Sequence, residues 1–250
     1  NNATQEDDIS RVSTKWYYSK NRWNNKLNIG YAFDLLDYEE RSGDLVNVHS
    51  TYNTHKIVVR EAVDWSNKQH EVKVGANYIS DVASGTQLNH VVLHQGGLFI
   101  TDKYHFLKNL WHLESSIRTD FHTEDKAGVS GNLSLNGQPI KKWPLKIKLA
   151  VLKNVKYPTV NELYFKPSGN QSLKKEQSWQ INGELYSEKR FELNQSKELK
   201  IQHSAEGYSI WLKDMIVWVP TNKVYWQPIN LTSVHSRGFK TKSGLYFQNT

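Results

Sequence analysis

The stretch "WHLESSIRTDF" runs from Trp111 to Phe121 and alternates between two kinds of side chain. Trp, Leu, Ile and Phe share one set of positions with Ser and Thr, while His, Glu, Ser, Arg and Asp occupy the other set. Successive side chains of a β-strand point to opposite faces of a sheet. The stretch therefore predicts a strand with one apolar face and one face in water.

The same alternation recurs along the chain, for example over 27–35, 72–78 and 145–151. It predicts an all-β fold of about twelve antiparallel strands. No amphipathic helix, linker or exact repeat is evident between them, so we expect a single domain over residues 1–250. The predicted strands lie near 11–20, 26–36, 45–63, 70–80, 88–103, 109–123, 128–137, 143–153, 177–187, 197–206, 209–220 and 231–248.

Composition excludes several classes of protein. The chain has no cysteine, so it has neither a disulfide framework nor a thiolate metal site. It has no apolar run long enough for a transmembrane helix. The formal net charge is 32 − 25 = +7. Because the basic residues are spread along the whole chain, we expect no nucleic-acid partner.

Aromatic residues gather near the ends of the predicted strands, as at Trp16, Trp23 and Trp65, and in two Trp-x-Pro triplets, 218–220 and 226–228. Such rings collect where hydrocarbon meets lipid headgroups, and proline ends a hydrogen-bond ladder. An antiparallel up-and-down transmembrane β-barrel would explain the pattern. On periodicity and composition alone, a soluble sandwich with Trp and Pro closing a hairpin explains it about equally well.

Two stretches favour the barrel: "YPTVNELYFKPSGNQSLKKEQSWQ" at 157–180 and "GYSIWLKDMIVWVPTNKVYWQPINLTSVHSRGFK" at 207–240. Both resemble the barrel of TonB-dependent outer-membrane receptors, with the cobalamin-receptor branch closest. The family's first motif is matched by Pro158, Thr159, Glu162, Leu163, Tyr164, Gly169, Asn170, Leu173 and Glu176. The second is matched by Asp214, Ile216, Pro228, Asn230, Arg237, Gly238 and Phe239, with Trp218, Pro220 and Trp226 beside it. The chain departs from the pattern at Gln171, Lys175 and Lys240.

This resemblance implies about half of a 22-stranded barrel in the outer membrane of a Gram-negative bacterium. It implies a fragment without the N-terminal plug, which would carry the contact with TonB, and without the C-terminal strands. The expected surroundings are the lipid bilayer and lipopolysaccharide. The expected activity is active transport of a scarce large nutrient, either cobalamin-like, a siderophore or haem, with motif residues in structural roles.

No catalytic motif stands out, so we expect no enzyme, no cofactor and no metal site. His112 and Glu114 share a face and are interpreted as a hydrogen-bonding pair in the barrel interior. The ligand contacts are unassigned. Polar or aromatic candidates, expected on long connections, are His49, Tyr52, His55, His90, His94, Tyr104 and His105. The alternative from another class is a soluble, secreted β-sandwich that binds glycans through its aromatic residues. A third alternative is a β-rich hydrolase domain, but the sequence contains no catalytic motif to support it.

Overall fold

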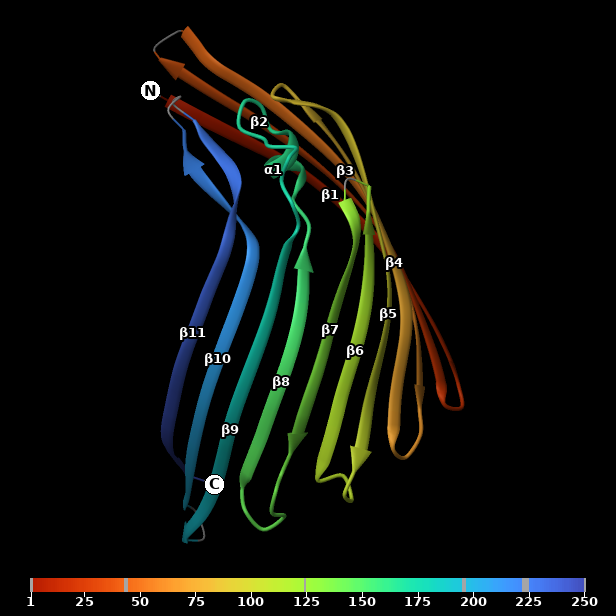
Figure 1. Ribbon diagram of the computed structural model, residues 1–250, viewed down its shortest axis with the longest axis vertical. Coiled ribbons are helices and arrows are strands. Elements are labelled where there is room, and N and C mark those ends of the chain that lie inside the picture. Colours follow the sequence, from red (N-terminus) through yellow and green to blue (C-terminus); the bar gives the residue numbers. More distant parts are fainter. Residues whose placement is uncertain (1, 43–44, 124, 195–196, 222–224, 250) are drawn as a thin grey trace.

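The computed structural model describes residues 2–42, 45–123, 125–194, 197–221 and 225–249. It forms one antiparallel sheet of eleven strands (Figure 1). The strands are β1 (Asn2–Lys20), β2 (Trp23–Ser42), β3 (Leu45–Ser66), β4 (His70–Gly85), β5 (Leu88–Phe106), β6 (Trp111–His122), β7 (Asp125–Gly137), β8 (Leu145–Lys156), β9 (Glu176–Asn194), β10 (Lys197–Pro220) and β11 (Trp226–Asn249). One short helix, α1 (Val160–Tyr164), lies between β8 and β9.

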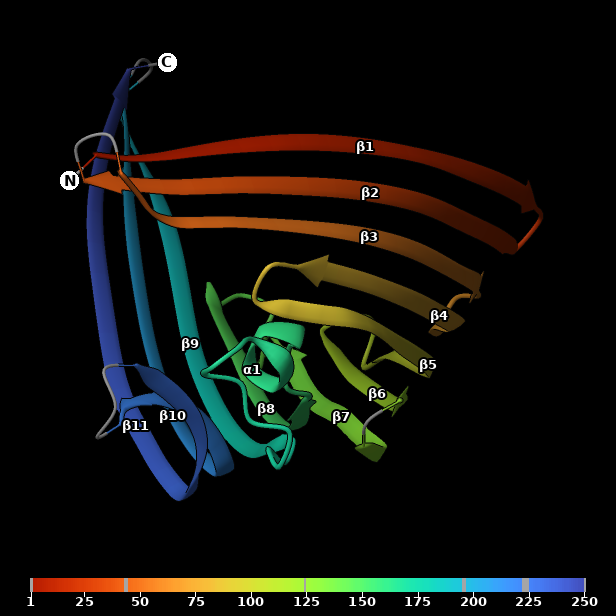
Figure 2. The same cartoon turned by 90° about the horizontal axis from the view of Figure 1, so that it is seen from above.

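The order of the strands in the sheet is their order in the chain, so each strand pairs with its sequence neighbours. Seen from above, the sheet curves into an open trough, and α1 lies on its concave side (Figure 2). Within the described residues, β1 and β11 are the two edges. This is the up-and-down arrangement that the alternation predicts, and it is a single layer of sheet rather than the two layers of a sandwich.

The inner, concave face is polar and the outer face is apolar. Asp34 and Thr54 are partners in the β2–β3 ladder and line the cavity beside α1, which identifies the inner positions. Apolar side chains at the alternate, outer positions stay exposed: Val12, Ile29, Ile57, Val74, Leu98, Ile117, Leu133, Leu149 and Ile181. A soluble sheet would bury such a face, whereas a transmembrane barrel turns it toward lipid.

Aromatic side chains border the apolar outer face in two rows. In the lower row, Trp23 and Trp65 are ladder partners with ring centroids 6.3 Å apart. In the upper row, the Tyr31 hydroxyl lies 2.7 Å from His55 Nδ1. Trp65 and His55 are ten residues apart on β3, about 33 Å of strand. At a tilt of about 40° this is roughly 25 Å of height, which is the apolar height of a transmembrane barrel.

Two expectations about the elements are wrong. The segments 197–206 and 209–220 form one strand, β10, because Gly207 stays in the ladder opposite both Gly183 and Phe239. Helix α1 was not expected, since five residues are too few to show a helical period. Among the described residues, no helix is long and apolar enough to cross a membrane.

Candidate functional site

Helix α1 begins with a complete capping box and packs on the inner face through its apolar side chains. The Thr159 hydroxyl accepts the backbone N–H of Glu162 at 3.3 Å, and the Glu162 carboxylate accepts the backbone N–H of Thr159 at 2.7 Å. Such reciprocal bonds satisfy backbone donors that a helix start leaves free. Leu163 is buried. Val160 and Tyr164 pack on a small core of Ala83, Leu88, Val91 and Leu93.

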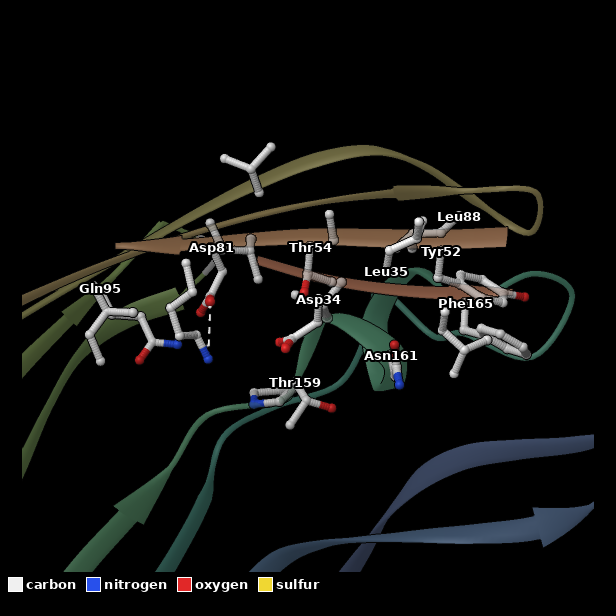
Figure 3. Close-up of a pocket in the computed structure, with 18 of the residues that line it drawn as sticks. Asp34, Leu35, Tyr52, Thr54, Asp81, Leu88, Gln95, Thr159, Asn161 and Phe165 are labelled. Atoms are coloured by element: carbon white, nitrogen blue, oxygen red, sulfur yellow. Dashed lines mark ion pairs between the residues drawn. The ribbon is translucent and has the colours of Figure 1, made fainter. Parts of the chain in front are cut away.

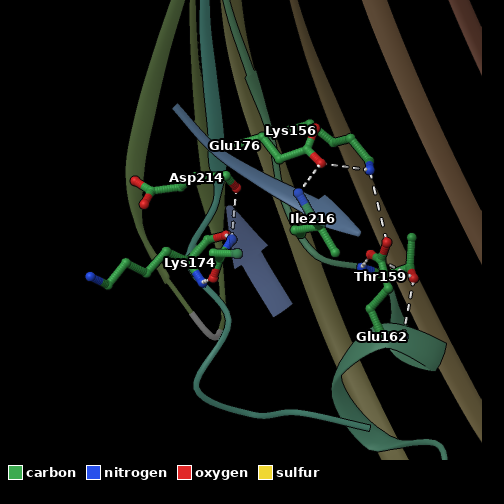
Figure 4. A network of polar contacts seen from close by, with 8 residues as sticks. Lys156, Thr159, Glu162, Lys174, Glu176, Asp214 and Ile216 are labelled. Atoms are coloured by element: carbon green, nitrogen blue, oxygen red, sulfur yellow. Dashed lines mark hydrogen bonds and ion pairs between the residues drawn. The ribbon is translucent and has the colours of Figure 1, made fainter. Parts of the chain in front are cut away.

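Charged and backbone groups tie the start of β9 to β8 and β10 (Figure 4). Glu176 Oε1 accepts the backbone N–H of Ile216 at 2.7 Å. The ammonium of Lys156 lies 3.4 Å from Glu176 Oε1 and 3.9 Å from Glu162 Oε1. Residues Lys156, Thr159, Glu162, Glu176 and Ile216, together with Asn230, form what we call the clasp.

Asn230 extends the clasp into β11. Its Oδ1 accepts the backbone N–H of Lys174 at 2.8 Å, and its Nδ2 donates to the carbonyls of Lys174 at 3.0 Å and Asp214 at 2.7 Å. The left-handed backbone of Asp214, with φ of 57°, presents that carbonyl. Asn170 Nδ2 donates to the Pro228 carbonyl at 3.0 Å. The loop 157–175 is thereby bonded to β11 at two residues, and Asn230 also joins β11 to β10 at this point.

Tyr157 anchors the other end of this loop. Its hydroxyl donates to the carbonyls of Asp120 at 2.9 Å and Lys126 at 3.2 Å, and its ring stacks on His122 with centroids 4.9 Å apart. Burial raises the pKa of the Tyr157 hydroxyl above its ordinary value, and the nearby carboxylates of Asp120 and Asp125 raise it further. The hydroxyl therefore stays protonated and keeps donating.

A cavity of about 720 Å³ opens between α1 and the inner face of β1–β5 (Figure 3). Its polar lining includes the side chains of Asp34, Tyr52, Thr54, Asp81, Gln95 and Asn161. Its size is that of a site for a substantial small molecule. Of its carboxylates Asp7, Asp34 and Asp81, Asp81 lies 3.1 Å from the Lys56 ammonium and Asp34 lies 3.8 Å from the Arg11 guanidinium.

The inner wall beyond the cavity carries charges that are paired with one another. Asp64 lies between Lys26 at 3.3 Å and Lys73 at 3.2 Å. Arg118 Nε donates to both carboxylate oxygens of Asp120 at 2.8 Å. Such pairs suit a wall in contact with water, where they are worth little individually. Among the described residues, no cluster of His, Asp or Glu side chains is arranged to hold a metal ion.

The structure brings only part of the expected ligand-contact set to this cavity. Tyr52 lines it, but all seven candidates lie within β3 and β5, and none is on a long connection. His55, His94 and Tyr104 face outward, as the register with Asp34 and Asp81 requires. His105 Nε2 lies 2.8 Å from Glu71 Oε1. His90 occupies an outer position, and His49 Nε2 lies 2.9 Å from Asp37 Oδ1, so neither lines the cavity. The sequence did not single out Asp34, Asp81 and Asn161 as cavity residues. The alternation assigns a strand residue to one face of the sheet, but it does not show which distant residues lie opposite it across the barrel interior.

His112 and Glu114 lie on the inner face, with Nε2 and Oε1 3.4 Å apart. No third ligand of a metal site joins them among the described residues. Their placement is therefore that of a polar pair on the inner wall.

Most of the family-motif residues cluster around the loop 157–175 and the tips of β10 and β11, whereas Arg237 and Gly238 lie in the middle of β11. Pro158 and Pro228 are buried, and Pro220 ends β10 opposite Trp226. A Cβ on Gly169 would lie 2.7 Å from the Leu163 carbonyl oxygen, and one on Gly238 would lie 2.6 Å from the Tyr208 ring. Gly169 therefore requires glycine, because the clash there is with backbone, whereas at Gly238 the Tyr208 ring would have to move.

The Trp-x-Pro triplets do not form the membrane girdle that the sequence suggested. On β10 the upper aromatic row is at Trp211, an outer residue whose ring stacks on that of His235 with centroids 5.1 Å apart. Trp218 lies seven residues beyond Trp211, toward the tip of β10, and Pro228 pairs with Trp218 inside the ladder. Arg237 is exposed on the outer face of β11. Residues 222–224, between the triplets, lie outside the described residues.

Comparison with known proteins assigns this arrangement. Residues 1–248 match the family described as "TonB dependent receptor-like, beta-barrel". The chain is 25% identical over 254 residues to the vitamin B12 transporter BtuB of Photobacterium profundum, covering 97% of this chain and 38% of the relative. It is 27% identical over 198 residues to BtuB of Vibrio vulnificus, covering 74% and 30%. The chain thus spans less than half the length of these relatives.

Solved structures share the fold. The ferric enterobactin receptor PfeA of Pseudomonas aeruginosa matches with a TM-score of 0.77 and 11% identity, covering 95% of this chain and 41% of that one. The copper transporter OprC matches with a TM-score of 0.74 and 13% identity, covering 94% and 43%. The family match and the curated relatives indicate a receptor barrel of the Gram-negative outer membrane rather than an enzyme or a glycan-binding sandwich. The chain belongs to the family of TonB-dependent receptor-like β-barrels.

Proposed function

We propose that this chain is part of the barrel of a receptor that imports a large, scarce nutrient, and that the nutrient is a cobalamin-like corrinoid. The observation that carries the proposal is the cavity between α1 and the inner face of β1–β5, in a chain that is similar to two curated proteins named vitamin B12 transporters. The import step would draw on TonB, as the family's name implies.

We further propose that the rest of the barrel and the plug belong to the same, longer polypeptide. Two observations support this. The chain spans 38% of the first relative, and the edge strands β1 and β11 each have one partner among the described residues. An unpaired strand edge within a membrane leaves backbone groups without hydrogen bonds, which is costly. The contact with TonB would be made by the plug portion.

The charges of the cavity distinguish among nutrients. Its lining has the carboxylates of Asp7, Asp34 and Asp81; Lys56 pairs with Asp81 and Arg11 pairs with Asp34, so one carboxylate is in excess. Ferric complexes of catechol siderophores are anionic, so this lining would repel them. A corrinoid presents peripheral amides, whose N–H groups can donate to carboxylate and amide oxygens such as those of Asp34 and Gln95. Neutral, amide-rich cargo therefore fits the lining better.

Uptake by cells that express the full-length receptor would test the proposal. Labelled cyanocobalamin should bind to their outer membranes and enter cells that have TonB, while cells without TonB should bind it but not import it. Unlabelled cyanocobalamin should compete, and ferric enterobactin and haem should not. If only a siderophore or only haem competed, the cobalamin assignment would be wrong and the competing compound would indicate the substrate class. Import that is independent of TonB would refute the transport mechanism.

A further inference from the structure

The two Trp-x-Pro triplets lie opposite each other in the β10–β11 ladder. Trp218 is the ladder partner of Pro228, and Pro220 is the ladder partner of Trp226. The two tryptophans are therefore diagonal neighbours, and each has a proline directly across from it. Diagonal neighbours on one face of an antiparallel pair are within reach of large aromatic side chains. These four residues form one surface, which we call the Trp-Pro platform.

The platform belongs to the inner face of the barrel. Asn230 marks that face, because its side chain bonds to the backbone of Lys174 in the loop that lies over the inner wall. Its ladder partner Ile216 shares this face and is buried. The platform residues follow two and four positions farther toward the tip, so the alternation of a strand puts them on the same face. The platform therefore faces the water inside the barrel and not the lipid.

Hydrogen bonds hold the platform in place on two sides. Asn170 of the loop donates through Nδ2 to the carbonyl of Pro228 at 3.0 Å. Toward the tip, the backbone N–H and the hydroxyl of Thr221 both donate to the carbonyl of Tyr225, at 3.1 and 2.8 Å. The backbone that carries both indole rings is thus fixed in advance. A preformed surface loses less conformational entropy when a ligand binds.

The platform is apolar, exposed and uncharged. Trp226 is 57% exposed and Trp218 is 39% exposed. The inner positions of 216–220 and 226–230, where every residue is described, hold no charged side chain: they are Ile216, Trp218, Pro220, Trp226, Pro228 and Asn230. Covering indole rings that face water is favourable, and their faces suit a flat ring. The platform therefore fits an uncharged, flat group and offers no cation to an anionic chelate.

The loop 157–175 borders both the platform and the cavity. Thr159 and Asn161 of this loop line the cavity, and Asn170 of the same loop bonds to the platform. Helix α1 and the tips of β10 and β11 lie side by side at one end of the sheet, as Figure 1 and Figure 2 both show. A nutrient that rests on the loop can thus contact the cavity with one part and the platform with another.

We propose that the Trp-Pro platform is the subsite for the nucleotide base of a corrinoid, and that it makes the receptor selective for complete cobalamins. This inference rests on the proposed function, because it assigns a second part of the same nutrient. A cobalamin carries peripheral amides on its corrin ring and a benzimidazole base on its nucleotide. The amides match the oxygen atoms that line the cavity. The base is flat, aromatic and uncharged, so it matches the platform by stacking.

Equilibrium binding to the full-length receptor would test this assignment, with radiolabelled cyanocobalamin and dicyanocobinamide as the two ligands. Dicyanocobinamide keeps the corrin ring and its amides but lacks the nucleotide and its base. The test variants are Trp226→Leu and Trp218→Leu, and Trp226→Phe retains an aromatic face. The matched control is Trp143→Leu, which removes a ring that is 58% exposed in the β7–β8 connection, at the opposite end of the sheet.

The parent should bind cyanocobalamin more tightly than dicyanocobinamide. Loss of one ring should weaken cyanocobalamin binding on the order of 10-fold, as expected for lost base stacking, and should leave dicyanocobinamide binding unchanged. Trp226→Phe and the control should bind both ligands as the parent does. If a leucine variant does not assemble, Trp226→Gln at the more exposed position provides the same comparison.

Two results would overturn the role of the platform and leave the proposed nutrient standing. The first is a parent that binds the two corrinoids equally well, and the second is a set of leucine variants that weaken both ligands alike or neither. If the parent bound neither corrinoid, the proposed function would be wrong and the base subsite would be wrong with it. The two failures are therefore distinguished by the parent alone.

Discussion

Glu176 Oε1 lies 2.7 Å from the backbone nitrogen of Ile216, so a carboxylate at the start of β9 closes a hydrogen bond that the backbone of β10 does not make within the sheet. The same oxygen lies 3.4 Å from the ammonium of Lys156 on β8. Three neighbouring strands therefore meet at one side chain. The family motif that begins at Pro158 ends at this glutamate, and its polar members are the groups that fasten the loop 157–175 over the inner wall.

Replacing Glu176 with alanine should loosen that loop. The change leaves the Ile216 N–H without its acceptor and Lys156 without one of its two partners, which costs about 1–3 kcal/mol. Limited proteolysis of the full-length receptor should then cut within 157–175 faster than in the parent. Glu184→Ala, on the same inner face of β9 but outside the clasp, is the control and should leave the loop protected. Equal cleavage of both variants would show that Glu176 does not fasten the loop 157–175.

Asn230 should tolerate aspartate no better than alanine. Its amide nitrogen donates to the carbonyls of Lys174 and Asp214, and an aspartate would set a carboxylate oxygen against them. We expect a loss of about 1–3 kcal/mol for Asn230→Asp, read as a lower midpoint of thermal unfolding. In Asn182 the oxygen accepts from Gln180 at 2.8 Å, and aspartate keeps that acceptor. Asn182→Asp should therefore be close to neutral, and an Asn230→Asp variant as stable as it would contradict the assignment.

The alternation in the sequence predicted most of the sheet because lipid on one side and water on the other impose a strict period of two. It placed Ile117 and Leu149 on the outer face and Arg118 and Lys148 on the inner one, as the register confirms. The prediction failed where the contrast between apolar and polar positions is weak. Gly207 was interpreted as a break between two strands, yet it lies in the middle of β10.

The residues of the candidate site were harder to predict from the sequence than the strands were. Asp34 and Asn161 are more than a hundred residues apart and meet only because the sheet curves and α1 folds onto its concave side. The motif pointed to the loop but not to the cavity beneath it. Conversely, the aromatic pattern was read as a girdle at Trp218 and Trp226, whereas the register places the upper row at Trp211. Strand length, which sequence alone gave only within a few residues, decides that difference.

The full-length receptor should run as a heat-modifiable band. A closed barrel stays folded in detergent at room temperature and migrates faster on a gel than the boiled, unfolded chain, because every strand edge is paired. We expect a large shift between unboiled and boiled outer-membrane samples. A product in the soluble fraction that shows no shift would contradict the membrane assignment.

A charge at the middle of the outer face should prevent assembly. Ile117 is 54% exposed on that face, and an arginine there would cost about 2–4 kcal/mol near the bilayer midplane. Ser116→Arg places the same side chain on the inner wall, in water, and should be tolerated. The heat-modifiable fraction measures both. Equal loss of the folded band would show that β6 does not have one lipid face and one water face.

Blocking the cavity should separate the ligand path from the lipid face. Thr54 lines the cavity on β3, and the next residue, His55, points outward to the upper aromatic row. Thr54→Trp fills the space before Asp34 and should abolish binding of the nutrient while leaving the heat-modifiable band intact. His55→Trp adds the same bulk at the headgroup level, where aromatic rings are favoured, and should bind as the parent does. If Thr54→Trp bound the nutrient normally, the ligand would have to pass along a different part of the inner wall. If both variants lost binding with their barrels intact, the division of β3 into a ligand face and a lipid face would be wrong.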